Sequence, residues 1–224
     1  MIIDSYFLVN DKHNIINEIC RLYNLGVKGF ILHSVICNKY TLYNILENLD
    51  YNISNKYNFY ITLPPNLIPN KDTVGVFLPK CLQNDNKEIL DAFEKSQKYN
   101  LPLFIHYREG WHDKTYLKLE KIKEYIEKFR NVKVVINGIN YSELLKIINL
   151  FYKLDNVLFD ISMFQSLEGL KILIEYFSDE RIIFGTGAPI NNPIPNILKI
   201  RYSTLSKKSL EKICYSNILS FLNI

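Results

Sequence analysis

The strongest constraint on the fold of this chain is a series of eight short apolar runs. Each run is rich in Ile, Val, Phe or Tyr, as strands buried on both faces of a parallel sheet are. Segments with helical periodicity lie between most of them. The runs are 1–8, 27–33, 57–63, 74–79, 101–106, 132–136, 156–161 and 181–186. Strands that alternate with helices predict a barrel or a doubly wound sheet, and the even count favours a closed (β/α)8 TIM barrel of the α/β class.

The segments between the runs give more local predictions. From Leu119 to Phe129, apolar residues recur at steps of three and four and mark one face of a helix. Gly26 is expected just after the first helix, and Ser206 at the start of the last one. The stretch 64–73 is too short and too rich in proline for a helix, so an irregular link is predicted between the third and fourth strands. A loop is also predicted over 187–196.

Composition and charge narrow the class of protein. The chain has 224 residues, 48% of them hydrophobic, and no linker divides it, so a single barrel domain over 1–224 is predicted. A net charge of +4 does not point to nucleic acid. No apolar run is long enough to cross a bilayer and no signal peptide is recognisable, which indicates a soluble, cytoplasmic protein without a membrane partner. The four cysteines have no CxxC or zinc-ribbon spacing and give no signal of a disulfide or a metal site. The oligomeric state is not indicated.

The motifs at the ends of the runs resemble those of the amidohydrolase-related (amidohydrolase 2) family. The first run, IIDSYFL, resembles an opening strand with an acid, a small residue and His-x-His. PLFIHYREG is similar to the strand that ends in a ligand histidine. KVVINGIN, NVLFDIS and RIIFGTGAPI stand where the family has its sixth, seventh and eighth strands, and the tail from Ser206 is similar to its closing helix. The resemblance implies a TIM barrel with its site at the carboxyl ends of the strands.

The residues that would bind the metal are mostly replaced. The resemblance implies ligands at the two first-strand histidines, the fifth-strand histidine and the eighth-strand aspartate. This chain has Tyr6, Leu8, His106 and Gly187 at those positions, and Gly138 replaces a sixth-strand histidine that positions water. Catalytic zinc needs about three protein ligands and an open position. We therefore expect no metal, no other cofactor and no metal-activated water.

Three residues are candidates for catalysis without a metal. His106 would act as general base, Asp160 would orient it, and Tyr6 would donate a hydrogen bond to an oxyanion. Each has a structural alternative. His106 is equally a hydrogen-bonded core residue, Asp160 equally caps the loop that follows it, and Tyr6 equally fills the space that the metal vacated.

Four residues are candidates for substrate binding. Arg108 would bind a carboxylate or phosphate, and Trp111 would stack on a ring. The alternative for this loop is a solvated segment in which Arg108 pairs with Glu109. His33 ends the second run and is expected to face the mouth, as is Asn137 at the sixth strand.

Two functions stay open. The first is a metal-independent hydrolase or lyase for a small molecule, because the family's range includes amide and lactone hydrolysis and decarboxylation; carboxylate-bearing substrates are included. The second is a catalytically inactive barrel that binds a small ligand or a protein partner. A nuclease is the weakest reading, because related nucleases use the missing histidines and the small positive charge offers no channel for a phosphate backbone.

Overall fold

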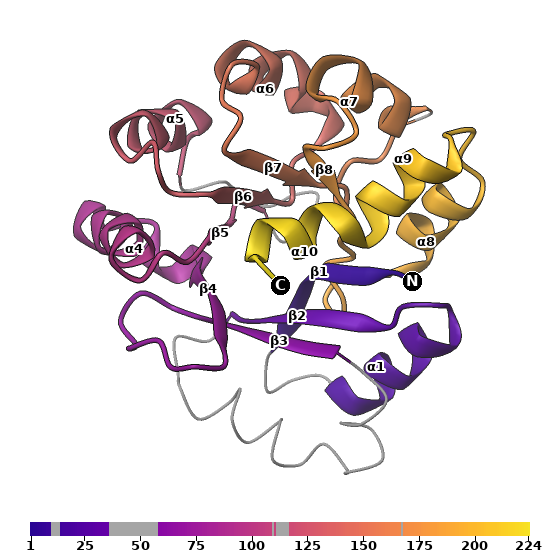
Figure 1. The fold of residues 1–224 in the computed structure, drawn as a ribbon, viewed down its shortest axis with the longest axis horizontal. Helices are drawn as coiled ribbons and strands as arrows, with labels where there is room; N and C mark the ends of the chain where they lie inside the picture. The colour runs from indigo at the N-terminus through magenta and orange to yellow at the C-terminus, as the bar shows by residue number, and fades with distance from the viewer. Residues whose placement is uncertain (10–13, 36–57, 109, 111–116, 167) are drawn as a thin grey trace.

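The computed structural model describes residues 1–9, 14–35, 58–108, 110, 117–166 and 168–224. Eight parallel strands form one sheet in which the spatial order follows the chain order (Figure 1). The strands are β1 (Ile3–Val9), β2 (Gly29–Ser34), β3 (Asn58–Leu63), β4 (Thr73–Leu78), β5 (Leu103–His106), β6 (Val134–Asn137), β7 (Val157–Asp160) and β8 (Ile182–Ile183). Each coincides with one of the apolar runs, which confirms the predicted barrel.

Backbone hydrogen bonds close the barrel between its first and last strands. The Ser5 amide donates to the Phe184 carbonyl at 3.0 Å, and the Leu8 amide donates to the Ala188 carbonyl at 2.7 Å. In the opposite direction, the Gly187 amide donates to the Tyr6 carbonyl at 2.8 Å. The short β8 is thus continued by the segment that follows it, which lies along β1.

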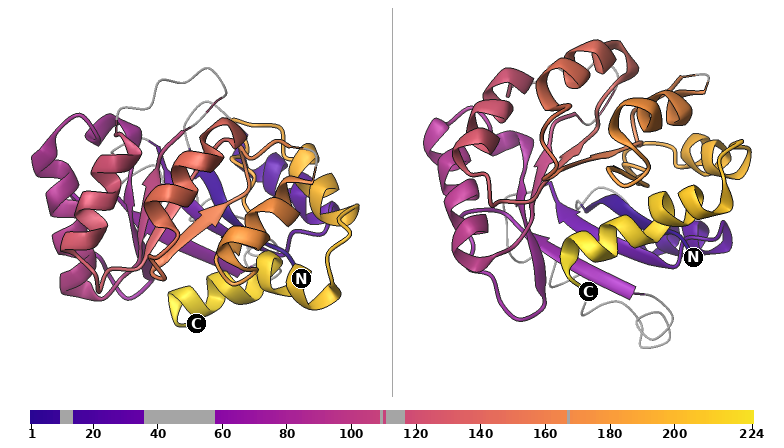
Figure 2. Two further views of the ribbon diagram at one scale, coloured as in Figure 1. Left: turned by 90° about the horizontal axis from the view of Figure 1, so that it is seen from above. Right: turned by 45° about the horizontal axis from the view of Figure 1, so that its top comes forward.

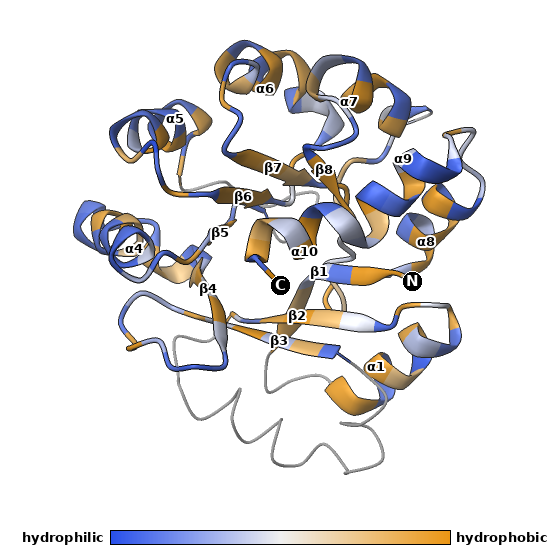
Figure 3. Cartoon of the chain, in the orientation of Figure 1, coloured by the Kyte–Doolittle hydropathy of each residue, from blue (hydrophilic) through white to orange (hydrophobic). Residues whose placement is uncertain are grey.

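Helices surround the sheet, with apolar residues on the sides that face it and polar residues outside (Figures 1, 2 and 3). No helix in the described part of the chain is long and apolar enough to cross a membrane. The α-helices are α1 (Ile15–Asn24), α4 (Asn86–Tyr99), α5 (Leu119–Lys128), α6 (Leu144–Phe151), α7 (Gly169–Phe177), α8 (Ile194–Arg201), α9 (Lys207–Glu211) and α10 (Asn217–Leu222), with 3-10 turns η1 (Lys80–Leu82) and η2 (Tyr141–Glu143) and a π-helical segment η3 (Lys212–Ser216).

Helix α10 covers the amino-terminal end of the barrel (Figure 1). Its residues Ile218, Phe221 and Leu222 pack against side chains of the barrel interior, including Ile3 and Val135. The Lys133 ammonium group just before β6 donates to the Phe221 carbonyl at 3.1 Å, near the carboxyl end of α10, where a cation is favourable. With this end covered, the carboxyl ends of the strands form the other end of the barrel, where a TIM barrel has its site.

Most local predictions are confirmed, with one shift of a boundary. Gly26 follows α1 with φ +105°, and the Ser206 hydroxyl accepts the Ser209 amide at the start of α9. The link between β3 and β4 contains no helix. The loop after β8 ends earlier than predicted, because α8 begins at Ile194. Pro195 is compatible with a helix there, since the first turn does not use its missing N–H.

One cysteine forms a disulfide that the spacing of the cysteines does not indicate. Cys81 in η1 is disulfide-bonded, and its partner lies outside the described residues. Cys20 and Cys214 are free thiols. Pairing depends on distances that spacing along the chain does not reveal.

Two glycines provide a test of the packing at the mouth. Gly138 and Gly26 both have positive φ, +84° and +105°. A Cβ on Gly138 would collide with the Arg108 carbonyl oxygen, whereas a Cβ on Gly26 would meet nothing within 4 Å. We predict that Gly138→Ala lowers the free energy of unfolding by about 3 kcal/mol or more, from backbone strain and overlap together. Gly26→Ala adds strain alone and should cost about 1–2 kcal/mol. Urea denaturation of both variants measures the difference, and equal losses would contradict the close approach of β5 and β6.

Candidate functional site

Five of the candidate residues lie at the carboxyl ends of the strands, as predicted. They are buried, with exposed fractions of 1% or less. His106 on β5 is in register with Asn137 on β6. The five are Tyr6, His33, His106, Asn137 and Asp160. Trp111 lies outside the described residues.

Aromatic rings occupy the centre of this end of the barrel. The Tyr6 ring lies between two imidazoles, with its centroid 6.0 Å from that of His33 and 5.7 Å from that of His106. Phe77 stacks on both imidazoles at 4.6 and 5.7 Å, and Phe104 lies 4.9 Å from His33. We call these five residues the ring cluster. Tyr6 therefore packs against both imidazoles, and the two phenylalanines contact the imidazoles in turn.

His33 is held as a neutral imidazole. Its Nε2 is 2.9 Å from the Ser5 carbonyl oxygen, which can only accept, so Nε2 carries the proton. Its Nδ1 is 2.7 Å from the Thr62 hydroxyl, which donates to it in this tautomer. Burial lowers the pKa of His33 to about 4. Near pH 7 this histidine stays neutral, and its two nitrogens join β1, β2 and β3.

The hydroxyl of Tyr6 and the guanidinium of Arg108 both have partners. Tyr6 donates to the Arg108 carbonyl oxygen at 3.0 Å, so its proton bonds the backbone. Arg108 donates to Glu143 Oε1 at 2.8 Å, and the Tyr107 hydroxyl donates to the same oxygen at 2.7 Å. The partner that the sequence analysis considered, Glu109, lies outside the described residues. Glu143, which sequence reasoning missed, is the acid that positions Arg108.

Asp160 bonds the backbone. Its Oδ2 accepts the Gly138 amide and its Oδ1 accepts the Ser162 amide, both at 2.6 Å. Burial raises the pKa of this carboxyl, and these hydrogen bonds oppose the rise. Within the described part of the chain, no hydrogen bond joins Asp160 to His106. Asp160 therefore caps the backbone of the loop that follows it, which is the structural alternative to orienting His106.

Asp4 is the titratable group that sequence reasoning missed. Its carboxylate accepts the Tyr6 amide at 3.1 Å, the Thr186 amide at 2.9 Å and the Thr186 hydroxyl. Burial raises its pKa to about 6 despite these hydrogen bonds, and the charge of Asp160 adds to the rise. The signal in the sequence is the acid of the first motif, IIDSYFL.

The donor atoms at the mouth do not suit the metal of the related hydrolases. Leu8 and Gly187 offer no donor atom, and the Tyr6 hydroxyl donates to a carbonyl. His33 presents its protonated nitrogen to another carbonyl. Among the described residues, no three His, Cys, Asp or Glu side chains are grouped to hold a metal ion.

Comparison with known proteins shows which family this barrel belongs to. The family model described as Amidohydrolase matches residues 81–224, more than half of the chain. The chain belongs to the amidohydrolase family. A search of the curated proteins found no match.

Several solved amidohydrolase-related structures have the same fold. An amidohydrolase 2 from Bifidobacterium longum subsp. infantis is 14% identical, with a TM-score of 0.70 over 100% of this chain and 98% of its own. A dihydroxybenzoic acid decarboxylase from Polaromonas sp. JS666, with bound manganese, is 12% identical, with a TM-score of 0.67 over 99% of this chain and 96% of its own. A 5-carboxyvanillate decarboxylase from Sphingomonas paucimobilis is also 12% identical, with a TM-score of 0.67 over 100% and 99%. At these identities the similarity shows the fold alone.

The raised pKa of Asp4 predicts a pH dependence of stability. Its ordinary pKa is 3.8 and its folded pKa is about 6, so folding favours the protonated acid. Its contribution to stability is full below about pH 4 and is lost as the pH rises through 6, by about 2–3 kcal/mol in all. We predict that Asp4→Asn removes this component. Unfolding of both proteins between pH 4 and 8 measures it. The stability gap between them should widen in favour of the variant from pH 4 to about 6 and then level off. A gap that does not change with pH would contradict the buried position of this carboxyl.

Proposed function

We propose that this amidohydrolase-family barrel binds a small carboxylate-bearing molecule at the carboxyl ends of its strands, without a metal ion and without catalysis. Two of the three groups assigned to catalysis, the Tyr6 hydroxyl and the Asp160 carboxylate, already bond the backbone. The His33 imidazole, assigned to substrate binding, does so as well. Within the described residues, no hydrogen bond joins His106, the candidate base, to Asp160, the acid that would orient it. Binding makes fewer demands on these groups than proton transfer does, because rings and fixed dipoles suffice for recognition.

The observation that carries the proposal is the carboxamide of Asn137. It is fully buried at the end of β6, beside Asp160, whose charged form it favours. The amide interacts with the Asp160 carboxylate, but neither its oxygen nor its nitrogen makes a hydrogen bond of good geometry with another residue of the described structure. A buried amide without hydrogen bonds costs about 1–3 kcal/mol. A ligand that bonds this amide would offset that cost.

Arg108 supports an anionic ligand. Its side chain is held near the mouth by Glu143 at 2.8 Å, and both side chains are largely buried. A guanidinium presents its N–H donors in a planar fork that matches the geometry of a carboxylate. The decarboxylases among the similar structures bear the names of aromatic carboxylates, so an aromatic carboxylate is the class of ligand that we propose.

Metal-independent hydrolysis or decarboxylation is the second candidate function. The observation in its favour is Asp4, whose pKa of about 6 suits proton transfer near neutral pH. Asp4 lies two residues before Tyr6, and His106 is retained at the fifth strand. Catalysis by this route would make carbon dioxide release depend on both Asp4 and His106.

Asn137 provides the test that separates binding from stability. We predict that Asn137→Leu raises the free energy of unfolding by about 1 kcal/mol, because an apolar group of similar size replaces an unbonded amide. The same change should weaken binding of 2,6-dihydroxybenzoate at least tenfold in calorimetric titration. Asn131→Leu, at an exposed position, is the matched control and should leave affinity unchanged.

The outcomes of this titration are distinct. Equal affinity for the wild type and Asn137→Leu would contradict a role of the amide in binding. Carbon dioxide release by the wild type that disappears in His106→Ala would favour the second candidate instead.

Metal content is a separate prediction. We expect protein purified without chelator and without a metal-affinity column to contain no stoichiometric zinc, manganese or iron, because His106 alone remains of the implied ligand set. Elemental analysis measures this directly. About one equivalent of a transition metal that is lost in His106→Ala would overturn the expectation and restore a metallohydrolase function.

A further inference from the structure

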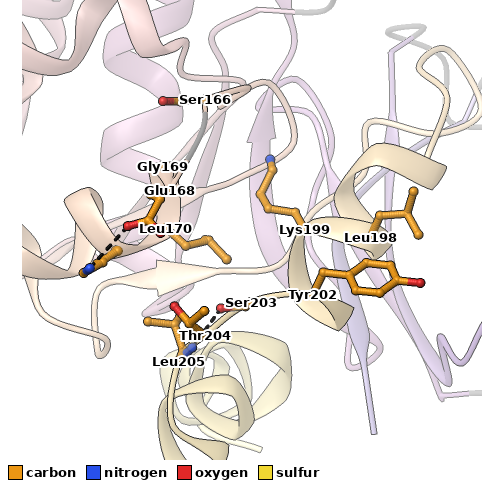
Figure 4. A pocket seen from close by; sticks show the side chains of 11 residues that line it. Ser166, Glu168, Gly169, Leu170, Leu198, Lys199, Tyr202, Ser203, Thr204 and Leu205 are labelled. Atoms are coloured by element: carbon orange, nitrogen blue, oxygen red, sulfur yellow. Dashed lines mark hydrogen bonds and ion pairs between the residues drawn. The ribbon is translucent and has the colours of Figure 1, made fainter.

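The pocket between α7 and α8 has polar groups that are already bonded within the chain (Figure 4). Glu168 pairs with Lys171 at 3.2 Å, and the Ser203 hydroxyl accepts the Leu205 amide at 3.1 Å. These groups need no ligand. Gln83 differs, because its side-chain oxygen is buried without a hydrogen bond in the described structure. A buried acceptor of this kind needs a partner from outside the chain, either a ligand or a water molecule.

Gln83 lies over the ends of two strands that carry the ring cluster. It follows η1, and its Nε2 donates to the Leu78 carbonyl at 3.2 Å and to the His106 carbonyl at 2.7 Å. Leu78 is the last residue of β4 and follows Phe77, and His106 is the last residue of β5. The side chain of Gln83 therefore ends at the carboxyl ends of β4 and β5, which is the end of the barrel where the proposed function places the ligand.

The two backbone bonds determine what Gln83 offers to a ligand. Carbonyl oxygens only accept, so the nitrogen of the side-chain amide, and not its oxygen, faces Leu78 and His106. Both N–H groups are used in this way, and within the described structure Oε1 is left without a donor. Because this oxygen can only accept, its partner must supply an O–H or N–H group.

Gln83 complements the two residues that support the proposed function. Asn137 is in register with His106 on the β6 side of β5, whereas Gln83 bonds His106 from the β4 side. Two buried side-chain amides thus flank the end of β5. Arg108, two residues beyond His106, offers N–H donors, and Gln83 offers an acceptor. A molecule that uses both needs an anionic group and a hydrogen-bond donor.

We propose that Gln83 selects carboxylates that also carry a hydroxyl or amino group, and that its Oε1 accepts a hydrogen bond from that group. The inference rests on the proposed function, because it assumes that a carboxylate binds at the mouth. A ligand without the donor leaves Oε1 buried and unpaired. Such a ligand binds more weakly, because the cost of keeping this oxygen away from water is then not offset.

Calorimetric titration with substituted benzoates tests the proposal. The probes are benzoate and the ortho, meta and para isomers of hydroxybenzoate, aminobenzoate and methoxybenzoate. We expect one hydroxy or amino isomer to bind the wild type about tenfold more tightly than benzoate and than the methoxy compound of the same position, which keeps a substituent but has no donor. Whichever of the two substituents binds more tightly identifies the donor. A methoxy compound that binds as tightly as its hydroxy and amino counterparts overturns the proposal.

Gln83→Met is the matched variant, because it keeps the length of the side chain and removes the acceptor. The preference for the donor-bearing isomer over benzoate should vanish in this variant. A purely structural role of Gln83 would instead weaken both ligands alike and leave the preference unchanged, which overturns the proposal. Gln97→Met, at an exposed position of α4, is the control and should keep the full preference.

Two further outcomes separate this inference from the proposed function. Equal binding of all the benzoates to the wild type contradicts the role of Gln83 alone. A wild type that binds none of them contradicts the proposed function, and the inference falls with it. If Gln83→Met does not fold, the comparison of hydroxy, amino and methoxy compounds on the wild type decides.

Discussion

The closure of the barrel between its first and last strands is the constraint on which the rest of the structure depends. β8 has only two residues, so regular strand pairing alone would join the last strand to the first over a short length. The buried carboxylate of Asp4 extends it, because it accepts amides from both sides: Tyr6 on β1 and Thr186 after β8. Since each amide would otherwise be buried without a partner, one acid satisfies the backbone of two strands that lie at opposite ends of the chain. A raised pKa is the consequence of placing a carboxyl where water does not reach.

This closure determines what the mouth contains. The side chain of Tyr6, two residues after Asp4 on β1, extends to the opposite side of the barrel mouth. There its hydroxyl donates to the Arg108 carbonyl. Gly185 leaves room for this path, because a Cβ there would lie 3.0 Å from both Tyr6 Cβ and Asp160 Oδ1. The ring cluster then forms around Tyr6, with two imidazoles against its faces and edges. A phenol thus crosses the barrel mouth and ties the first strand to the loop after the fifth.

The sequence predicts the fold much better than the site. Strand positions follow from apolar runs, whose length and residue types are local properties. Gly26 and Ser206 are local signals as well, because each lies at the helix end that it marks. The partners of Arg108 and Asp160 are not local: Glu143 lies 35 residues from Arg108, and the Gly138 amide lies 22 residues from Asp160. A motif identifies which residue stands at a strand end, but it does not show whether its polar atoms face a ligand or the backbone. The disulfide at Cys81 and the role of Asp4 escaped prediction for the same reason.

The polar residues of the mouth fall into two groups with different physical roles. Asp4, Asp160, His33 and Tyr6 satisfy backbone groups, so replacing any of them exposes an unpaired donor or acceptor in a dry interior. Asn137 differs from them, because within the described structure its amide makes no hydrogen bond of good geometry and interacts only with the Asp160 carboxylate. A buried amide in this state costs stability, and packing does not offset that cost. A ligand at the carboxyl end of the barrel would offset it by bonding the amide, which is why the proposed function places the ligand there.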